Sequence, residues 1–211
     1  MTPLYTDERE AKLRQLTSNI VAVIENTPDI LTAKTVRVPD ISTAVFDPHS
    51  LEDSESMPRA FGFMKDFISQ DLKLEVKTIV DQLYDAKKAT IWGHAPGYNV
   101  DNVGQAFLDN YCHALLTGPD GPLKCESPLG AFVLFGPETL YKDHSHTPNE
   151  IYLALTDGGE WRVGDSGWRS LEAGDTIFVP SETVHAIRTG SEPILTFSFW
   201  LEAGDMNTIE I

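Results

Sequence analysis

The sequence has few basic residues. Lysine and arginine together number 16, against 32 aspartates and glutamates, and the formal net charge is −16. A surface of this sign repels phosphate backbones and anionic lipid head groups, so neither nucleic acid nor a membrane surface is an expected partner. An acidic surface also favours solubility by itself, so the charge excludes partners without naming one.

Cysteines and long apolar runs are also scarce. Cys112 and Cys125 are the only cysteines and form no CxxC pair, so the sequence predicts no disulfide framework. No apolar run approaches the ~20 residues that span a bilayer, and charges such as Asp7 and Arg14 interrupt the region where a secretory leader would have its apolar core. We therefore expect a cytoplasmic protein. The sequence does not fix the oligomeric state, and a homodimer is one of the states it allows.

The chain changes character near Gly118. Before it, apolar residues recur every three or four positions over 13–24, 72–83 and 107–115, which predicts amphipathic helices, and a short helix is expected over 59–69. We expect residues 1–118 to form a helical region packed on the second part of the chain.

Residues 119–211 have the pattern of a β domain. Gly118-Pro119-Asp120-Gly121-Pro122 is dense in turn-forming residues. Short apolar or alternating runs follow it, and such spacing favours a sandwich or a jelly-roll barrel. The predicted strands cover 130–136, 150–156, 160–163, 175–180, 184–188 and 194–201.

Four residues have the types and spacing of metal ligands. His144 and His146 are two apart, so on an extended strand they share a face, and Glu150 begins the next strand after a turn. His185 follows the Gly174–Pro180 segment and supplies a fourth ligand. Imidazole and carboxylate suit one divalent transition metal ion, with Zn, Fe, Mn, Co and Ni all left open.

Two motifs carry these ligands. The pattern HxHxxxE ends at Glu150, and GxxxxxPxxxxH ends at His185. Together they resemble the two conserved motifs of the cupin superfamily, which implies a mainly β fold in which 119–211 form a cupin barrel with a helical N-terminal extension. Glu182 replaces a usual glycine, Thr189 replaces an asparagine, and the first-motif glycine falls one place late at Gly158. None of these positions is a ligand.

The remaining histidines lack ligand spacing. His49, His94 and His113 each stand alone, and His113 falls in the predicted helix over 107–115. We expect each of them to be a packed or surface residue and not a catalytic one.

Tyr152 is the candidate general base. It lies two residues beyond Glu150, so on a strand it shares the face of that ligand, where Ala154 and Thr156 leave space for a substrate. A phenol titrates near ~10, and a nearby divalent cation favours the phenolate. The alternative is an aromatic side chain that only fills the barrel.

Trp200 and Tyr141 are candidate cavity residues. Trp200 ends a face of the last strand that also carries Thr196 and Ser198, and Tyr141 precedes His144 by three residues. Aromatic faces attract cations, at ~0.5–2 kcal/mol each. Packing in the core remains the alternative for both.

Anchors for a phosphate are missing from 119–211. No arginine cluster or glycine-rich loop occurs there, so a carboxylate substrate would be held chiefly by the metal. The basic residues of this part are Lys124, Lys142, Arg162, Arg169 and Arg188.

With these residues in view, the C-terminal half resembles the cupin dimethylsulfoniopropionate lyases of marine bacteria. The resemblance is carried by the stretches 118–122, 144–152, 159–165 and 184–189. It implies a metal-dependent β-elimination of a small zwitterionic sulfonium substrate to dimethyl sulfide and acrylate. The implied roles are metal ligands at His144, His146, Glu150 and His185 (not all in every member), the base at Tyr152, and pocket walls at Tyr141 and Trp200, with Tyr141 a second candidate base.

Other functions remain open at this point. A cupin dioxygenase using Fe(II) and O₂ is the main rival, because a His/Glu site with open positions also suits that chemistry. A non-catalytic ligand-binding cupin is a further alternative. A sugar-phosphate isomerase is disfavoured because the barrel has few basic residues.

Overall fold

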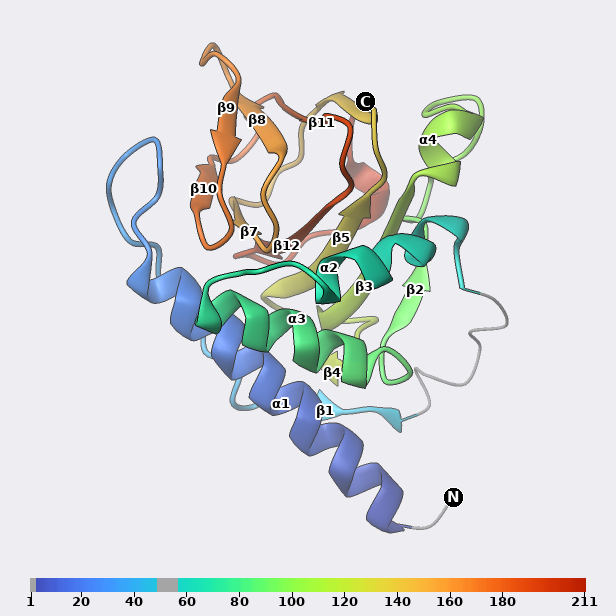
Figure 1. Ribbon diagram of the computed structural model, residues 1–211. Helices are drawn as coiled ribbons and strands as arrows, with labels where there is room; N and C mark the ends of the chain where they lie inside the picture. The colour runs from blue at the N-terminus through green and yellow to red at the C-terminus, as the bar shows by residue number, and fades with distance from the viewer. Residues whose placement is uncertain (1–2, 49–56) are drawn as a thin grey trace.

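The computed structural model describes residues 3–48 and 57–211, and its chain folds as two β-sheets with helices on one side (Figure 1). The larger sheet has eight strands and the smaller has four, and buried side chains from both sheets form one core between them. The expected fold class is confirmed: a mainly β chain with a cupin barrel and a helical N-terminal extension.

The larger sheet has the order β1-β4-β3-β5-β12-β7-β10, with β2 paired to β3, and the smaller has the order β6-β11-β8-β9. Each of the six predicted strands is present, within a residue or two of the expected ends. The strands are β1 Val45–Phe46, β2 Ile91–Gly93, β3 Tyr111–Gly118, β4 Leu123–Lys124, β5 Leu129–Phe135, β6 Leu140–His144, β7 Glu150–Ala154, β8 Gly159–Val163, β9 Arg169–Leu171, β10 Thr176–Val179, β11 His185–Thr189 and β12 Ile194–Trp200.

The first two predicted helices are confirmed as α1 (Pro3–Asn26) and α3 (Leu74–Ala86). Most residues of their apolar stripes are fully buried, Leu16 and Ile20 on α1 and Ile79 on α3 among them. The two helices lie side by side against the larger sheet (Figure 1). Burying each such side chain contributes about 1.5–3 kcal/mol, so this packing fixes the helices to the barrel. The short helix expected over 59–69 is present as η2 (Arg59–Phe63) followed by α2 (Met64–Ile68).

The helix predicted over 107–115 is wrong. A five-residue helix, α4 (Gln105–Asp109), ends there, and β3 (Tyr111–Gly118) follows. Both faces of β3 are buried, one toward the helices and one toward the barrel interior, so its sequence is apolar almost throughout. A strand buried on both faces loses the polar alternation that distinguishes it from a helix.

Strands on both sides of Gly118 belong to one sheet. β1, β2 and β3 come before it in the chain and pair within the eight-stranded sheet, and β3 pairs along its length with β5. The barrel wall therefore includes residues from the segment expected to be helical.

Side chains alternate between the two faces of the larger sheet. On β7, Ile151 and Leu153 pack in the core that includes the helices, whereas Tyr152 and Ala154 pack in the core between the sheets. On β12, Leu195 likewise faces the helices. The faces predicted from the sequence for these two strands are confirmed. The face toward the space between the sheets is left for polar groups.

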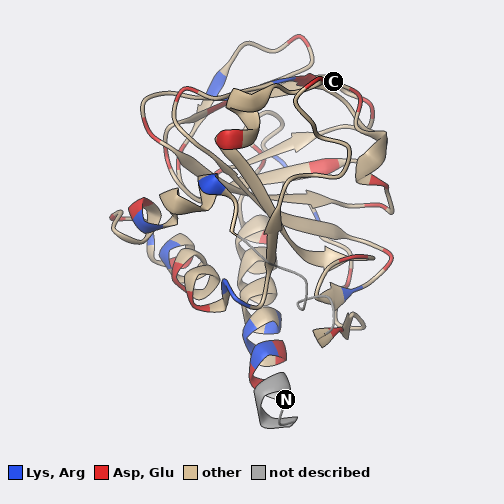
Figure 2. Cartoon of the chain, turned by 90° about the vertical axis from the view of Figure 1, so that its right-hand side faces the viewer, with Lys and Arg blue, Asp and Glu red and all other residues tan. Residues whose placement is uncertain are grey.

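Charged residues lie mainly on the helices and the loops (Figure 2), and six of the twelve strands have no lysine, arginine, aspartate or glutamate. Of the helices that the structure describes, none is both long and apolar enough to cross a bilayer.

Candidate metal centre and active site

The candidate ligands come from both sheets. His144 ends β6, His146 follows just after it, and His185 begins β11, paired in register with His144 in the four-stranded sheet. Glu150 begins β7 in the larger sheet. The imidazoles and the carboxylate meet because the barrel brings the two sheets face to face.

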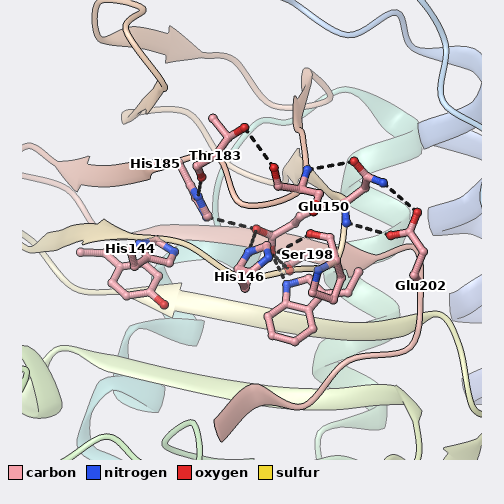
Figure 3. Close-up of polar contacts among 12 residues, drawn as sticks. His144, His146, Glu150, Thr183, His185, Ser198 and Glu202 are labelled. Atoms are coloured by element: carbon pink, nitrogen blue, oxygen red, sulfur yellow. Dashed lines mark hydrogen bonds and ion pairs between the residues drawn. The ribbon is translucent and has the colours of Figure 1, made fainter. Parts of the chain in front are cut away.

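His146, Glu150 and His185 form a buried cluster whose ligand atoms all lie within 4.8 Å of one another. Nε2 of His146 is 2.9 Å from Glu150 Oε2, and Nε2 of His185 is 3.3 Å from the same oxygen. Figure 3 shows these contacts converging on Glu150. No carboxylate, thiol or further imidazole of the described chain joins the three.

Backbone carbonyls orient both imidazoles. Nδ1 of His146 donates to the Pro148 carbonyl at 3.0 Å, and Nδ1 of His185 donates to the Thr183 carbonyl at 2.9 Å. A carbonyl only accepts, so Nδ1 carries the proton and a neutral ring has its lone pair on Nε2. Both lone pairs then face the Glu150 carboxylate, which is itself an acceptor.

This arrangement of acceptors requires a positive charge. A proton on Nε2 of His146 satisfies one contact, but Nε2 of His185 is buried and has no hydrogen-bond partner among the described residues. Two imidazoles fixed by backbone carbonyls, together with a carboxylate, are the donors and the supporting hydrogen bonds of a divalent transition metal site. The residues therefore fit the metal that the sequence predicts.

The second oxygen of Glu150 is also held in place. Ser198 Oγ donates to Oε1, and Trp200 Nε1 donates to the same atom at 3.2 Å. Both donors come from β12, which pairs with β7, so the sheet register fixes the carboxylate. Trp200 also packs on the His146 ring, with centroids 4.5 Å apart.

The protonation states of Glu150 and His146 are coupled. Burial raises the pKa of Glu150, but His146 and His185 more than offset this, and the net pKa lies below its usual range. Burial lowers the pKa of His146, but the Glu150 carboxylate outweighs it, and the net pKa lies above its usual value. Without an ion, the pair is held as imidazolium and carboxylate.

His144 lies beside this cluster and not in it. Its Nδ1 donates to the Lys142 carbonyl at 2.8 Å, its ring stacks on Tyr141 with centroids 3.8 Å apart, and it contacts the His185 ring at 3.9 Å. Figure 3 shows it apart from the dashed contacts around Glu150. Burial, with His185 next, holds the pKa of His144 well below its usual value, so the ring is neutral and its Nε2 is free to bind.

The departures from the cupin motifs are accommodated locally. Glu182 adopts the left-handed conformation, with φ 56°, and its N–H donates to the His146 carbonyl at 2.8 Å. Thr189 Oγ1 accepts from the Thr139 N–H and donates to the Gly136 carbonyl, both at 2.8 Å. The turn that precedes His185 therefore still forms, at the cost of placing a non-glycine residue at positive φ.

A cavity of about 50 Å³ adjoins the cluster, and Tyr141, Tyr152 and Trp200 all line it. The placement of these three in the cavity wall agrees with the sequence analysis. A larger hollow of about 660 Å³ lies outside the barrel beside α1 and α3, away from the ligands, so we take the smaller cavity as the functional one.

Sequence reasoning missed several residues of this wall: Tyr98, Tyr111, His113, Met206 and Ile209. Tyr111 and His113 lie two residues apart on β3 and so share a face, a relation that the helix prediction for this segment does not reveal. Tyr98 follows a Pro-Gly pair in a loop, where no periodicity reveals its direction. His94 is exposed as expected, and His49 lies outside the described residues.

The phenols of the cavity are uncharged in this form of the protein. Burial, and then the Glu150 carboxylate, hold the pKa of Tyr152 well above its usual value. Burial and neighbouring tyrosines do the same for Tyr141, whose hydroxyl is hydrogen-bonded to that of Tyr98. No lysine or arginine is among the described residues that line the cavity, so a phenolate would need a cation bound there.

Comparisons with known proteins show the family to which the chain is similar. The model of the family described as dimethylsulfoniopropionate lyase matches residues 42–196. The dimethylsulfoniopropionate lyase DddQ of Ruegeria pomeroyi is 33% identical over 115 residues, which cover 54% of this chain and 56% of that protein. The chain thus matches about half the length of the curated relatives.

Two solved structures share the fold over almost the whole chain. One, from a study of the lyases RdDddP and RnDddQII, has a TM-score of 0.78 at 22% identity and covers 96% of this chain and 98% of its own. The other is DddQ from Ruegeria pomeroyi, with a TM-score of 0.72 at 23% identity, covering 95% of this chain and 96% of its own. The helical extension and the barrel are therefore shared as one arrangement.

The His146–Glu150 pair predicts a pH dependence in metal-free protein. The pKa of His146 is higher in the folded protein than in the unfolded chain, where it is ~6.5. The protonated ring therefore stabilises the fold fully below pH ~6.5, and this stabilisation is lost as the pH rises through the pKa of the folded protein. The free energy of unfolding of chelator-treated protein, measured with urea between pH 6 and 9, should therefore fall toward alkaline pH. His146→Gln should flatten this slope, whereas His94→Gln, at an exposed ring, should keep it. Equal slopes for wild type and His146→Gln would show that the pair does not stabilise the fold.

Proposed function

The chain belongs to the dimethylsulfoniopropionate lyase family, and from this premise we propose that it cleaves dimethylsulfoniopropionate to dimethyl sulfide and acrylate by β-elimination. One observation carries the proposal: a buried His-Glu-His cluster able to hold a metal opens onto a cavity walled by tyrosines and a tryptophan. The substrate has a carboxylate that a metal binds and a sulfonium that aromatic rings attract.

His146, Glu150 and His185 would hold one divalent ion, with the neutral Nε2 of His144 next to them as a fourth donor. Zn, Fe, Mn, Co and Ni all suit these ligands. When bound, such an ion supplies positive charge that stabilises the substrate carboxylate as the α-proton leaves.

Tyr152 is the proposed general base. It follows Glu150 by two residues on β7, and both residues line the cavity. Its oxygen takes the α-proton, the electrons of the C–H bond form the double bond of acrylate, and the C–S electrons leave with sulfur as neutral dimethyl sulfide. The high pKa of Tyr152 in the metal-free protein follows from burial and the Glu150 charge, so ionisation of this phenol depends on a cation in the cluster.

Tyr141 and Trp200 are the proposed walls for the sulfonium. Tyr141 is stacked on His144 and Trp200 is packed on His146, so each ring is held next to the ligand cluster. The cavity wall has no lysine or arginine among its described residues, which favours a ligand that carries its own positive charge. Each cation–π contact is worth ~0.5–2 kcal/mol, and no lysine or arginine of the described lining opposes it.

Product analysis tests the proposed function directly. Metal-loaded protein given dimethylsulfoniopropionate should release dimethyl sulfide into the headspace and leave acrylate in equal amount, without consuming oxygen. Oxygen uptake without dimethyl sulfide would indicate a dioxygenase. Saturable binding without any product would indicate a ligand-binding cupin.

Replacing Tyr152 by phenylalanine tests the base. The change deletes one oxygen and conserves the ring, so fold and metal content should stay near wild type. Turnover should fall by about 10²–10⁴-fold, as expected for loss of a positioned acid–base group, while KM changes little. Tyr84→Phe, at a tyrosine that does not line the cavity, is the matched control. Retention of more than half of the wild-type kcat would assign the base elsewhere, with Tyr141 the next candidate.

Metal analysis tests the ligands. Gently purified wild type should contain close to one transition metal ion per chain. His185→Ala should lose most of the metal, because only two ligands of the three-residue cluster remain. His144→Ala should lose less, because His144 lies beside that cluster. His94→Ala serves as control. Full occupancy in His185→Ala would remove His185 from the site.

A further inference from the structure

His113 is a buried polar residue for which the chemistry above has no use. It lies on β3 and lines the same cavity, with 6% of its surface exposed. Its neighbours Cys112 and Ala114 belong to the core beneath the helices, so strand alternation directs His113 to the barrel interior. Nδ1 of its ring has no hydrogen-bond partner within the described part of the chain.

Few buried polar atoms of the described residues lack a partner in this way, and they are Trp92 Nε1, His113 Nδ1, Trp161 Nε1 and His185 Nε2. The nitrogen of His185 is accounted for by the metal cluster. Trp92 and Trp161 do not line the cavity. Outside the metal cluster, His113 is thus the residue of the described cavity wall with an unpaired buried side-chain nitrogen, and such a group is destabilising unless something binds it.

The His113 ring is neutral. Burial lowers its pKa to about 4, the Gly93 backbone raises it by less, and the nearby His94 lowers it further. A neutral imidazole has one N–H and one lone pair. Because the Gly93 backbone favours the N–H form of one nitrogen, the lone pair remains available on the other.

His113 lines the same cavity as Glu150 and lies in the same sheet, with β5 and β12 between their strands. Its register partner is Val133 on β5, which is paired with Thr196 on β12 and through it with Ala154 on β7. Ala154 is four residues beyond Glu150 on the same strand. A ligand whose carboxylate is held by a metal ion at Glu150 therefore has its other end in the cavity whose wall contains His113.

We propose that His113 is a specificity-determining residue that contacts the sulfonium end of the substrate through the lone pair of its neutral ring; this inference rests on the proposed function. A sulfonium distributes its positive charge over its methyl groups, whose C–H bonds then point to an acceptor. A lysine here would repel this charge, and a carboxylate would compete for the metal. A neutral imidazole attracts the sulfonium without repelling its charge and without competing for the metal.

A pair of stable ligands of equal shape isolates the recognition of charge. The two are 3-(trimethylammonio)propanoate and 4,4-dimethylpentanoate, which differ in having a cationic nitrogen or a neutral carbon at the same position. Dissociation constants are measured by calorimetry on the metal-loaded enzyme, so no turnover is needed. His113→Leu should weaken binding of the cationic compound by about 3- to 30-fold, the range of cation–dipole and cation–π contacts, and change binding of the neutral one by less than about 2-fold.

Further variants separate this role from packing. His113→Asn keeps an uncharged acceptor and should retain most of the preference for the cationic compound. If His113→Leu unfolds, His113→Met is measured in its place. His94→Leu, at the exposed neighbouring ring, should behave as wild type. An equal effect of His113→Leu on both compounds, or no effect on either, would overturn the proposal. A wild type that prefers the cationic compound in a His113-dependent way but releases no dimethyl sulfide would overturn the proposed function alone.

Discussion

Glu150 faces the Nε2 atoms of two imidazoles whose Nδ1 atoms are held by backbone carbonyls, and the rest of the site follows from this contact. A carboxylate and two lone pairs in a buried space repel one another unless a cation lies between them. The backbone carbonyls at Pro148 and Thr183 fix the rings in this orientation, so rotation of the rings does not relieve the repulsion. The geometry is stable only with a proton or a metal ion bound.

The two sheets make this contact possible. His185 belongs to the four-stranded sheet, His146 follows the end of β6 in that sheet, and Glu150 belongs to the eight-stranded one, so neither sheet alone contains a metal site. The helices contribute indirectly: α1 and α3 bury the outer face of the larger sheet with aliphatic side chains. The hydrophobic burial that stabilises the fold is thus concentrated on the face away from the ligands, which leaves the inner face free for polar and aromatic groups.

The charge of the His-Glu-His cluster and the protonation state of the cavity tyrosines are linked. In the metal-free protein the Glu150 carboxylate raises the pKa of Tyr152, and it is also among the causes for Tyr98 and Tyr111. A divalent ion held by Glu150 would reverse the sign of the local charge, so the same proximity that suppresses ionisation would then favour it. In the proposed mechanism, the acid–base role of Tyr152 is therefore coupled to metal binding by its distance from Glu150.

The sequence by itself determined the parts of the site that are local in the chain. The motif spacing of His144, His146 and Glu150 and the alternation along β7 and β12 are local in the chain, so candidate ligands and cavity faces could be predicted from residue numbers. Tertiary structure decided the rest. Tyr111 and His113 were hidden because β3 is buried on both faces and lacks alternation, and the loop carrying Tyr98 has no period at all. His185 joins the cluster, whereas His144 lies beside it. This difference depends on how the two sheets face each other across the barrel. The spacing of residues along one strand does not determine how such distant segments are placed.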